Sequence, residues 1–371
     1  MSKKPIIFSF FAGSGFLDLG FENSSFEVRF VNEFYKPFQD AYKFSRSRMG
    51  IDEPLYGFHQ GSIEEFLNDS EVASQQLTSN IKAAKQEELV GFIGGPPCPD
   101  FSVGGKNRGR EGDNGRLTEA FVQLIIKYKP DFFLIENVKG LWKTTKHRIF
   151  YQEMKVLLED AGFILCDRLT NSIEFGVPQT RERIFLFGIK KTLLNKKNIN
   201  FPWERYLKFD RNIINQKSIW PSTATYVEDS TLAQPCLMTD KLEELTVEYW
   251  FRKNNVELHP NARHHFTPRQ ALIRFQTIDE GDVRGKSFKR LHRWRYSPTA
   301  AYGNNEVHLH PYRSRRLSAA EALAIQSLPQ EFILPPYMKL SDMFKTIGNG
   351  VPYLLSEGIA KSIYDFLNET T

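Results

Sequence analysis

Residues 5–20 read PIIFSFFAGSGFLDLG, and the order of residue types in this run predicts the fold class. The apolar residues 5–11 predict a short buried strand, which leads directly into a Gly-x-Gly turn at Gly13 and Gly15. Such a turn lets the backbone approach a bound nucleotide closely, and the next helix directs its N-terminus toward the ligand. Strand, glycine turn and helix in this order predict an α/β fold with a Rossmann-like sheet.

An acidic residue follows the second predicted strand. Residues 28–32 form a strand-like run that ends at Glu33. A carboxylate at this point can accept hydrogen bonds from a ribose diol, whereas the alternative is an ordinary surface acid at a strand end. The spacing from the glycines favours the ribose, and the nucleotide is then either NAD or S-adenosylmethionine.

Cys98 stands on a loop that neither a strand nor a helix can include. The run at residues 89–93 predicts another buried strand, and it stops at the Gly-Gly-Pro-Pro sequence of residues 94–97. Ligands of an open α/β sheet bind at such strand ends. The thiol is therefore either a nucleophile, which reacts as the thiolate, or a small buried hydrophobic residue.

A second acid leaves an apolar strand. Residues 130–135 predict this strand, and Glu136 follows it. Partial burial raises the pKa of such a carboxyl, which lets it hold a proton near neutral pH and protonate a substrate nitrogen. The alternative is that Glu136 braces the neighbouring loop.

Residues 175–187 alternate between charged and apolar side chains, as a strand with one face in a polar site does. Arg181 and Arg183 are then expected to point in the same direction. Two guanidinium groups on one face suit a phosphate or a carbonyl oxygen, and a structural ion pair is the alternative.

The composition is that of a globular protein. The 371 residues are 41% hydrophobic and 25% charged, which fits two domains. Apolar runs such as residues 132–135 fall far short of the roughly 18 residues that cross a bilayer, and the N-terminus lacks a signal-peptide pattern. The three cysteines are too scattered for a disulfide framework or a zinc site, so we expect no bound metal and a reducing cytoplasm.

Positive charge is concentrated in one segment. The net charge is only +5, yet residues 252–316 contain 14 Lys or Arg residues against five Asp or Glu residues. Arginines alternate with aromatic residues within the sequence RLHRWRY at residues 290–296. Phosphates attract cations and bases stack on aromatic rings, so this pattern indicates a nucleic-acid surface, and a solvated basic face is the alternative.

The C-terminal part carries local signals of its own. Ser318 and Glu321 form a capping-box pattern that predicts the start of a helix, and Pro329 is expected to end it. The run GNG at residues 348–350 predicts a turn before the final helix.

Six segments, taken in order, resemble the motifs of the C5-cytosine DNA methyltransferase family. The resemblance implies a Rossmann-like S-adenosylmethionine-dependent methyltransferase sheet with a smaller, basic target recognition domain. It covers residues 5 to about 190 and 315 to the end, so we expect a catalytic domain at 1–190 plus 315–371 and a DNA-binding domain at 191–314. The motifs are FAGSG (11–15) with Glu33, GPPC (95–98), ENV (136–138), QTRER (179–183), the segment from Arg316 to Pro329, and GNGVP (348–352).

The resemblance also implies a mechanism for methylating C5 of a cytosine within a specific short duplex sequence. Cys98 adds to C6 of the base while Glu136 donates a proton to N3. Arg181 and Arg183 hold the carbonyl side of the base and the nearby backbone. Because C6 is shielded in a stacked duplex, the base must be flipped out. The expected DNA contacts are Ser102, Arg290, Arg293 and Arg295.

The methyl donor implied by the resemblance is S-adenosylmethionine. Many family members have Asp-Ile where this chain has Ser62 and Ile63, so Ser62 offers only a hydroxyl to the adenine. Many members also place Gln after the catalytic cysteine, whereas Pro99 has no side-chain donor. The expected donor contacts are Phe11, Ala12, Gly13, Gly15, Glu33, Ser62, Ile63, Pro97, Leu117, Asn349 and Val351.

Three other functions fit parts of this pattern. A nicotinamide-dependent oxidoreductase would share the glycine turn and Glu33 but would not need Cys98 or the basic segment. A tRNA-directed member of the family would share every catalytic motif, although the Cys-Phe-Thr signature of that group is absent and the nearest run begins at Cys236. A catalytically silent DNA-binding homologue usually lacks the catalytic residues, and all of them are present here.

We expect a monomer that acts on duplex DNA in the bacterial cytoplasm, associated with the nucleoid and not with a membrane. The first strand begins within ten residues of Met1, a layout that suits a compact bacterial or phage enzyme. Its functional partner is then a cognate restriction endonuclease. Neither charge nor periodicity predicts which DNA sequence is recognised.

Overall fold

The structure of the chain is a computed structural model. The residues that it describes are 4–97, 113–143, 145–194, 200–216, 218–236, 238–268, 272–285, 287–300, 302 and 307–370.

The described strands form one seven-stranded sheet with the order β3-β2-β1-β4-β5-β7-β6. The strands from β3 to β5 in this order are parallel, whereas β7 runs antiparallel to both β5 and β6. The predicted α/β sheet is confirmed, with one reversed strand that the sequence did not indicate. The strands are β1 (Ile6–Phe10), β2 (Glu27–Asn32), β3 (Phe58–His59), β4 (Val90–Gly94), β5 (Phe132–Val138), β6 (Phe163–Asn171) and β7 (Glu182–Lys190).

Helices alternate with the strands through the first half of the chain, are short from α7 to α10, and become longer again in α11 and α12. The α-helices are α1 (Phe16–Glu22), α2 (Lys36–Arg48), α3 (Val72–Glu87), α4 (Asp113–Tyr128), α5 (Lys139–Lys143), α6 (Thr145–Asp160), α7 (Asp240–Glu243), α8 (Val247–Lys253), α9 (Leu272–Thr277), α10 (Ala319–Ile325), α11 (Leu340–Asn349) and α12 (Tyr353–Thr370). Short 3-10 helices are η1 (Ile63–Leu67), η3 (Ser172–Phe175), η4 (Lys191–Leu193) and η5 (Arg211–Asn215).

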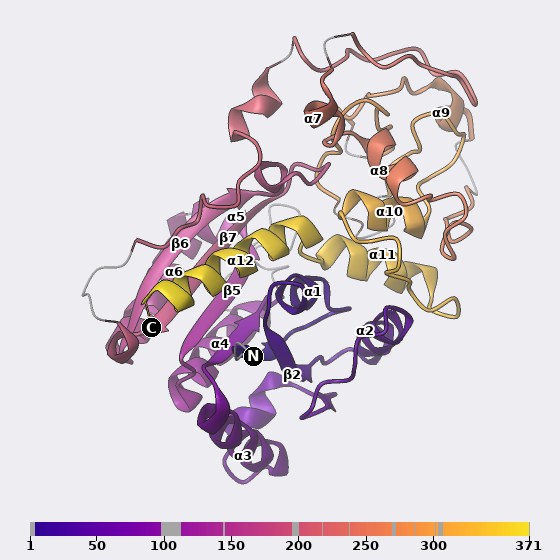
Figure 1. Cartoon of the computed structure of the whole chain (residues 1–371). Coiled ribbons are helices and arrows are strands. Elements are labelled where there is room, and N and C mark those ends of the chain that lie inside the picture. The colour runs from indigo at the N-terminus through magenta and orange to yellow at the C-terminus, as the bar shows by residue number, and fades with distance from the viewer. Residues whose placement is uncertain are drawn as a thin grey trace.

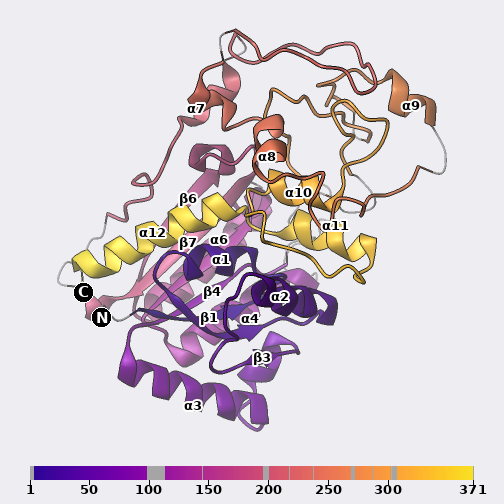
Figure 2. The same ribbon diagram turned by 45° about the vertical axis from the view of Figure 1, so that its right-hand side comes forward.

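Each strand sends alternate side chains into two layers. Ile6, Phe8 and Phe10 of β1 pack in one hydrophobic cluster, and Ile7 packs in another on the opposite face. The first cluster includes residues of α3, α4 and α6, and the second includes residues of α1, α2 and α12, so helices cover both faces of the sheet (Figures 1 and 2). The central strands β1 and β4 are therefore buried along their whole length, as in other sheets covered on both sides.

Packing against the sheet continues beyond the predicted domain boundary at residue 190. Phe201 lies 4.5 Å from Phe187 of β7 and 5.4 Å from Phe366 of α12, measured between ring centroids. Arg205 forms ion pairs with Asp365 and Glu369 of the same helix. The chain thus packs against α12 before the basic segment begins at residue 252.

The basic segment and the C-terminal segment share a hydrophobic core. Trp250 and Phe251 of α8 belong to the same buried cluster as Leu323 of α10 and Phe344 of α11. Figure 1 shows α10 and α11 next to the part of the chain that carries α8. The division at 314 and 315 therefore cuts through a common core, and the two-domain boundaries stay a prediction.

The predicted capping box at α10 is confirmed. The Ser318 hydroxyl accepts a hydrogen bond from the Glu321 backbone N–H, and the Glu321 carboxylate accepts one from the Ser318 backbone N–H. The helix ends at Ile325, four residues earlier than Pro329 predicts.

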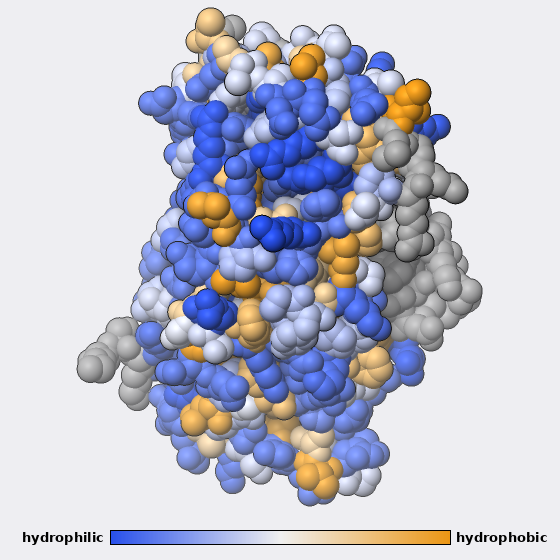
Figure 3. Space-filling model, turned by 90° about the vertical axis from the view of Figure 1, so that its right-hand side faces the viewer, coloured by the Kyte–Doolittle hydropathy of each residue, from blue (hydrophilic) through white to orange (hydrophobic). Residues whose placement is uncertain are grey.

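The face of the molecule in Figure 3 is mainly hydrophilic, with hydrophobic residues in small separate groups. Within the part of the chain that is described, no helix is both long enough and apolar enough to span a bilayer.

Candidate active site

The segments with predicted chemistry meet at one edge of the sheet. β1, β4 and β5 are parallel neighbours, so the segments that follow them leave the sheet on the same side. β7 runs in the opposite direction, and its first residues therefore lie at this edge as well, where Arg183 pairs with Val138. The reversed strand explains how Arg183 reaches a site formed by strand ends.

The glycine turn after β1 has the conformation that its residues predict. Gly13 and Gly15 both have left-handed backbone angles, with φ of +58° and +80°. A Cβ atom on Gly15 would lie 2.5 Å from the Tyr42 ring, so only glycine fits there. A Cβ atom on Gly13 would meet none of the described atoms within 4 Å. Open space for a ligand therefore lies beside Gly13.

Glu33 connects the end of β2 to this turn. Its Oε2 accepts a hydrogen bond from Gly13 N at 2.8 Å, and its Oε1 accepts one from Tyr35 N at 2.7 Å. Burial raises the pKa of Glu33, against the effect of these backbone donors. Each carboxylate oxygen has a second lone pair, so the group can shape the turn and still accept a bond from a ribose hydroxyl.

Phe34 is a residue that the sequence interpretation missed. Its side chain is 69% exposed, which is unusual for phenylalanine, and it directly follows Glu33. An exposed ring next to a candidate ribose site offers a stacking surface for a nucleobase. The only sequence signal was the aromatic residue placed immediately after the acid.

Ser62 and Ile63 are engaged in local structure. The Ser62 hydroxyl caps η1, where it accepts a hydrogen bond from Glu64 N, and Glu65 completes the capping box. Ile63 is buried in the cluster that holds Phe10 and Phe66. The predicted contact of Ser62 with adenine thus competes with a helix cap.

Glu136 is a buried acid paired with an arginine. Its Oε1 lies 2.8 Å from Arg183 Nε, and its side chain is 10% exposed. Burial raises the pKa of Glu136, while the charges of Arg183 and Arg181 lower it. Burial and the neighbouring guanidinium groups therefore act on the pKa of this carboxyl in opposite directions, and burial has the larger effect.

The segment that leads to the cysteine touches this acid. A Cβ atom on Gly95 would lie 2.8 Å from Glu136 Oε2, so the backbone at Gly95 packs directly on the carboxylate. Pro97 is half-buried at the end of the same segment. Cys98, Pro99 and Ser102 lie outside the described residues, so their predicted roles stay predictions.

Arg181 binds protein backbone. Its guanidinium donates to the carbonyl oxygens of Ala300 at 3.0 Å and Gly348 at 2.7 Å, and the side chain is 1% exposed. Arg181 thus joins three segments that are far apart in the chain. This geometry argues against the expectation that Arg181 and Arg183 together hold the base, because the Arg181 donors in these bonds already point at carbonyls.

The returning C-terminal segment lies beside the glycine turn. Ser14 Oγ and Thr346 Oγ1 of α11 are 2.7 Å apart. Asn349 is exposed at the end of α11, whereas Val351 is buried. Leu117 of α4 and Phe11 pack partly buried on the other side, against the core of the sheet. The contacts of Phe11, Leu117, Asn349 and Val351 with a donor stay predictions.

Two of the predicted DNA contacts lie in the interior of the protein. Arg290 is fully buried and donates to four backbone carbonyls, among them that of His310. Arg293 is buried and pairs with Glu280 at 2.8 Å. These side chains cannot reach phosphates, so the prediction for Arg290 and Arg293 is wrong for this structure. Arg295 is half-buried, and within the described part of the chain its side chain forms no hydrogen bond or ion pair.

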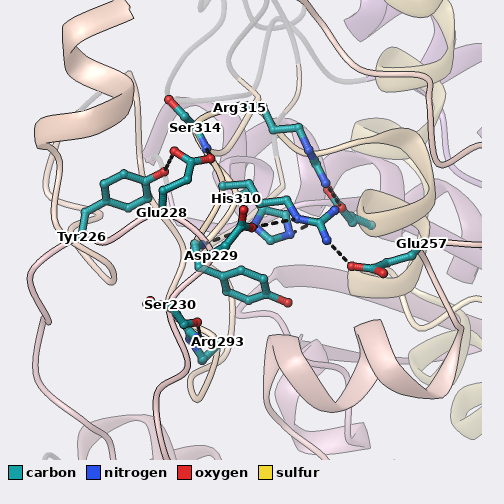
Figure 4. Close-up of polar contacts among 12 residues, drawn as sticks. Tyr226, Glu228, Asp229, Ser230, Glu257, Arg293, His310, Ser314 and Arg315 are labelled. Carbon is teal, nitrogen blue, oxygen red and sulfur yellow. Dashed lines mark hydrogen bonds and ion pairs between the residues drawn. The ribbon is translucent and has the colours of Figure 1, made fainter.

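Arg293 belongs to a network that fastens one loop to another (Figure 4). Arg293 donates to Ser230, and the carboxylate of Glu228 accepts a hydrogen bond from Ser314 N at 2.9 Å. Tyr312 accepts a backbone hydrogen bond from Asp229 N at 2.8 Å. Charge that the sequence assigned to DNA binding thus partly serves to hold the basic segment together.

An apolar hollow of about 760 Å³ lies elsewhere, on the outer side of α4 and α6. Ile149, Val156 and Leu157 line it, and none of the predicted site residues does. Among the described residues, no cluster of three or more His, Cys, Asp or Glu side chains is arranged to hold a metal ion.

Comparison with known proteins decides the family. The model of the family described as C-5 cytosine-specific DNA methylase matches residues 6–365. The chain belongs to this family. The methylase is 54% identical to the type II methyltransferase M.NmeDI of Neisseria meningitidis serogroup C over 98% of its own length and 84% of the relative. It is 28% identical to M.FnuDI of Fusobacterium nucleatum, over 98% and 95% of the two chains. The recognition of a C5-cytosine DNA methyltransferase from its motifs is confirmed.

Solved structures confirm the fold of the methylase. A DNA modification methyltransferase encoded within a prophage of E. coli superposes with a TM-score of 0.68 at 20% identity, over 98% of this chain and 100% of that one. The Dnmt2 methyltransferase of S. pombe superposes with a TM-score of 0.61 at 10% identity, over 99% of both chains. At these identities the likeness concerns the fold alone.

Proposed function

We propose that this methylase transfers a methyl group from S-adenosylmethionine to C5 of a cytosine flipped out of a specific short duplex DNA sequence. Its product would protect host DNA in a restriction–modification system, in the cytoplasm of a bacterium, with a cognate endonuclease as functional partner. The observation that carries the proposal is the contact of Gly95 with Glu136, because it brings the segment before Cys98 to a buried acid. Relatives described as type II methyltransferases support the DNA substrate and the biological setting.

The chain's residues fit the methyl donor. Open space beside Gly13, the carboxylate of Glu33 and the exposed ring of Phe34 follow one another along the sheet edge. They offer a cradle for the methionine part, an acceptor for the ribose and a stacking surface for the adenine. When bound, the donor supplies an electrophilic methyl group on a sulfonium. Ser14, fixed on Thr346, holds the turn against α11 from the other side.

The protein's own groups would make cytosine C5 nucleophilic. The thiolate of Cys98 forms a bond to C6 while Glu136 gives a proton to N3, and C5 then carries enamine character and attacks the methyl group. Loss of the C5 proton and breakage of the bond between sulfur and C6 release the product, and N3 returns its proton to Glu136. Arg183 orients Glu136 throughout and offers further guanidinium N–H groups to the base carbonyl. No residue is assigned as the base for the C5 proton.

A Cys98→Ser variant tests the proposal. Bisulfite sequencing of DNA from cells that express the wild-type protein should show protected cytosines at one short sequence, and the variant should show none. Cys236→Ser is the matched control, because Cys236 is exposed and follows the last strand of the sheet by more than 40 residues, within the predicted DNA-binding domain. Methylation by Cys98→Ser at the wild-type level would refute the nucleophile.

Two further measurements complete this test. A duplex with 5-fluorocytosine at the protected position should trap a covalent adduct on Cys98, since fluorine blocks the final proton loss. Purified tRNA should accept no methyl group under conditions that saturate duplex DNA, and transfer to tRNA alone would favour the tRNA-directed alternative. Light scattering of the free protein checks the expectation of a monomer.

A further inference from the structure

A buried polar cluster lies directly beneath the glycine turn, and the proposed chemistry does not use it. It consists of Asp18 and Glu22 on α1 and Tyr42 and Arg46 on α2. Asp18, Tyr42 and Arg46 are buried, and the Glu22 side chain is 14% exposed. Buried charges destabilise a protein unless they are paired and hydrogen-bonded, so a cluster at this place calls for a physical reason.

Arg46 connects the cluster to the turn. Its Nη2 donates to the Gly15 carbonyl oxygen at 2.6 Å, and its Nε pairs with Glu22 Oε2 at 2.7 Å. The guanidinium carbon also lies 4.4 Å from the centre of the Tyr42 ring. A planar guanidinium held in three directions cannot rotate without losing one of these contacts. The position of the Gly15 carbonyl is therefore fixed from α2.

Gly15 is the pivot of the turn. Its N–H donates to the Ala12 carbonyl at 2.9 Å, and its carbonyl accepts the first helical hydrogen bond, from Leu19 N, at 3.0 Å. No side chain caps α1 at this position, and glycine with φ of +80° has no side chain of its own to anchor the turn. At Gly15 the hold is thus supplied from outside the turn, by Arg46, in addition to the contacts of Glu33 with Gly13 and of Ser14 with Thr346.

Asp18 is a second carboxyl in the space around Arg46. Asp18 Oδ1 accepts a hydrogen bond from Ser9 Oγ at 2.9 Å, and burial together with the charge of Glu22 raises the pKa of Asp18 to about 7. Protonation of Asp18 removes a charge from the cluster and leaves the contact between Arg46 and Glu22 in place. The guanidinium therefore stays directed at Gly15.

We propose that Arg46 is a positioning residue for the methyl donor, because through the Gly15 carbonyl it holds residues 12–15 in the conformation against which the donor binds. The inference rests on the proposed function, in which S-adenosylmethionine binds at this turn. A purely structural arginine would stabilise the fold and leave the affinity for the donor unchanged. The two roles therefore differ in a measurable quantity.

Arg29 is the matched control. It is also nearly buried and forms ion pairs with Glu27 at 2.8 Å and Glu87 at 2.7 Å. It lies on β2 and makes none of its described contacts with the glycine turn. Arg29→Met and Arg46→Met each remove a buried guanidinium from an ion pair. Only the second change releases the Gly15 carbonyl.

The experiment measures binding of S-adenosylmethionine and of S-adenosylhomocysteine by calorimetry, with no DNA present. We expect Arg46→Met to weaken both ligands about 10- to 100-fold, the range for one lost charged hydrogen bond, and Arg29→Met to stay within about twofold of the wild type. Arg46→Lys keeps the charge without the planar fork and should fall between the two. Affinity for duplex DNA without donor should be equal in all four proteins.

The outcomes distinguish a positioning role of Arg46 from a purely structural one, and both from a failure of the proposed function. Equal donor affinity in Arg46→Met and Arg29→Met would overturn the positioning role and leave the proposed function intact. Absence of donor binding by the wild-type protein would overturn the proposed function and this inference with it. Should Arg46→Met fail to fold, as judged by circular dichroism, Arg46→Lys and Glu22→Gln decide: wild-type donor affinity in both would overturn the inference, and weakened affinity in both would support it.

Discussion

Arg183 Nε and Glu136 Oε1 are 2.8 Å apart, across two strands that run in opposite directions. In this antiparallel pair Arg183 lies opposite Val138 and Glu136 lies opposite Phe185, so the two charged side chains are diagonal neighbours on one face. The guanidinium keeps a buried carboxyl oriented and partly offsets the effect of burial on its pKa. An acid that is desolvated yet oriented in this way is suited to exchange a proton with a flipped base.

We expect Glu136→Gln to lower methyl transfer to duplex DNA by about 10²- to 10⁴-fold, because an amide cannot give a proton to N3. Transfer of a radiolabelled methyl group measures this, with the affinities for DNA and donor measured separately and expected to stay near those of the wild type. Glu182→Gln is the control, since Glu182 is a half-buried neighbour paired with Lys139. A Glu136→Gln enzyme within a few-fold of wild-type activity would contradict the role.

Arg181→Met should loosen the junction between the basic segment and the catalytic core. Two hydrogen bonds from a charged donor are lost, and the carbonyls of Ala300 and Gly348 remain buried without them. A loss of about 3 to 5 kcal/mol in the free energy of unfolding follows, measured by urea denaturation. The KM for DNA should rise with it.

Arg205→Met is the comparison for this change. Arg205 also joins distant parts of the chain, through Asp365 and Glu369, but on the exposed surface. Exposed ion pairs contribute little to stability, so the urea midpoint should not move measurably. Equal effects of the two substitutions would show that Arg181 has no special role at the junction.

Arg295→Ala and Arg293→Ala should affect different properties. Arg295 is the predicted DNA contact whose side chain is partly exposed, and its loss should weaken DNA binding and lower the slope of log K against log salt by about one, without changing the urea midpoint. Arg293→Ala leaves Glu280 buried without its partner, which destabilises the fold by about 3 to 5 kcal/mol. If Arg293→Ala weakened DNA binding and Arg295→Ala destabilised the fold, the structural role of Arg293 would be refuted.

Three histidines make stability depend on acidity. Burial lowers the pKa of His292 to about 4 and the pKa values of His308 and His310 to about 3. In the unfolded chain they bind protons below about 6.5, so the unfolded state is favoured as the pH falls from 6.5 toward 4. Their contribution to the free energy of unfolding is complete above about pH 6.5. It is lost as the pH falls through the pKa values that they have in the folded protein.

His308→Gln removes one of these groups and keeps a polar side chain near Ser297. Between pH 6 and pH 4, the slope of the unfolding free energy against pH should decrease by about 1.4 kcal/mol per pH unit, which is the effect of one proton. Urea denaturation followed by tryptophan fluorescence measures both slopes. From pH 7.5 to 8.5 the two proteins should have parallel curves, and parallel curves at acid pH as well would disprove the assignment.

The catalytic framework could be predicted because its signals are local in the chain. Gly13 and Gly15 indicate a turn that needs a left-handed backbone. Glu33 is recognisable because it follows the second strand at a short distance in sequence from these glycines. The capping box at Ser318 depends on four consecutive residues. Such features are determined by neighbours within a few positions, and the order of the motifs adds the family resemblance.

The errors concern burial and direction. Counting charges between residues 252 and 316 correctly marked a basic segment, but the count does not show that Arg290 and Arg293 point inward. Alternation along β7 placed Arg183 on the polar face of a strand without showing that the strand is reversed. Exposure and strand direction depend on what packs around a residue, and that information is spread over the whole chain.

The sequence by itself determined which chemical groups this methylase has and which turns and caps present them, because bond geometry and residue preferences act over a few positions. The tertiary structure alone decided which groups meet: Gly95 with Glu136, Ser14 with Thr346, and Arg46 with Gly15. These partners are between 31 and 332 positions apart in the chain. Only the packing of helices on both faces of the sheet brings such residues into contact.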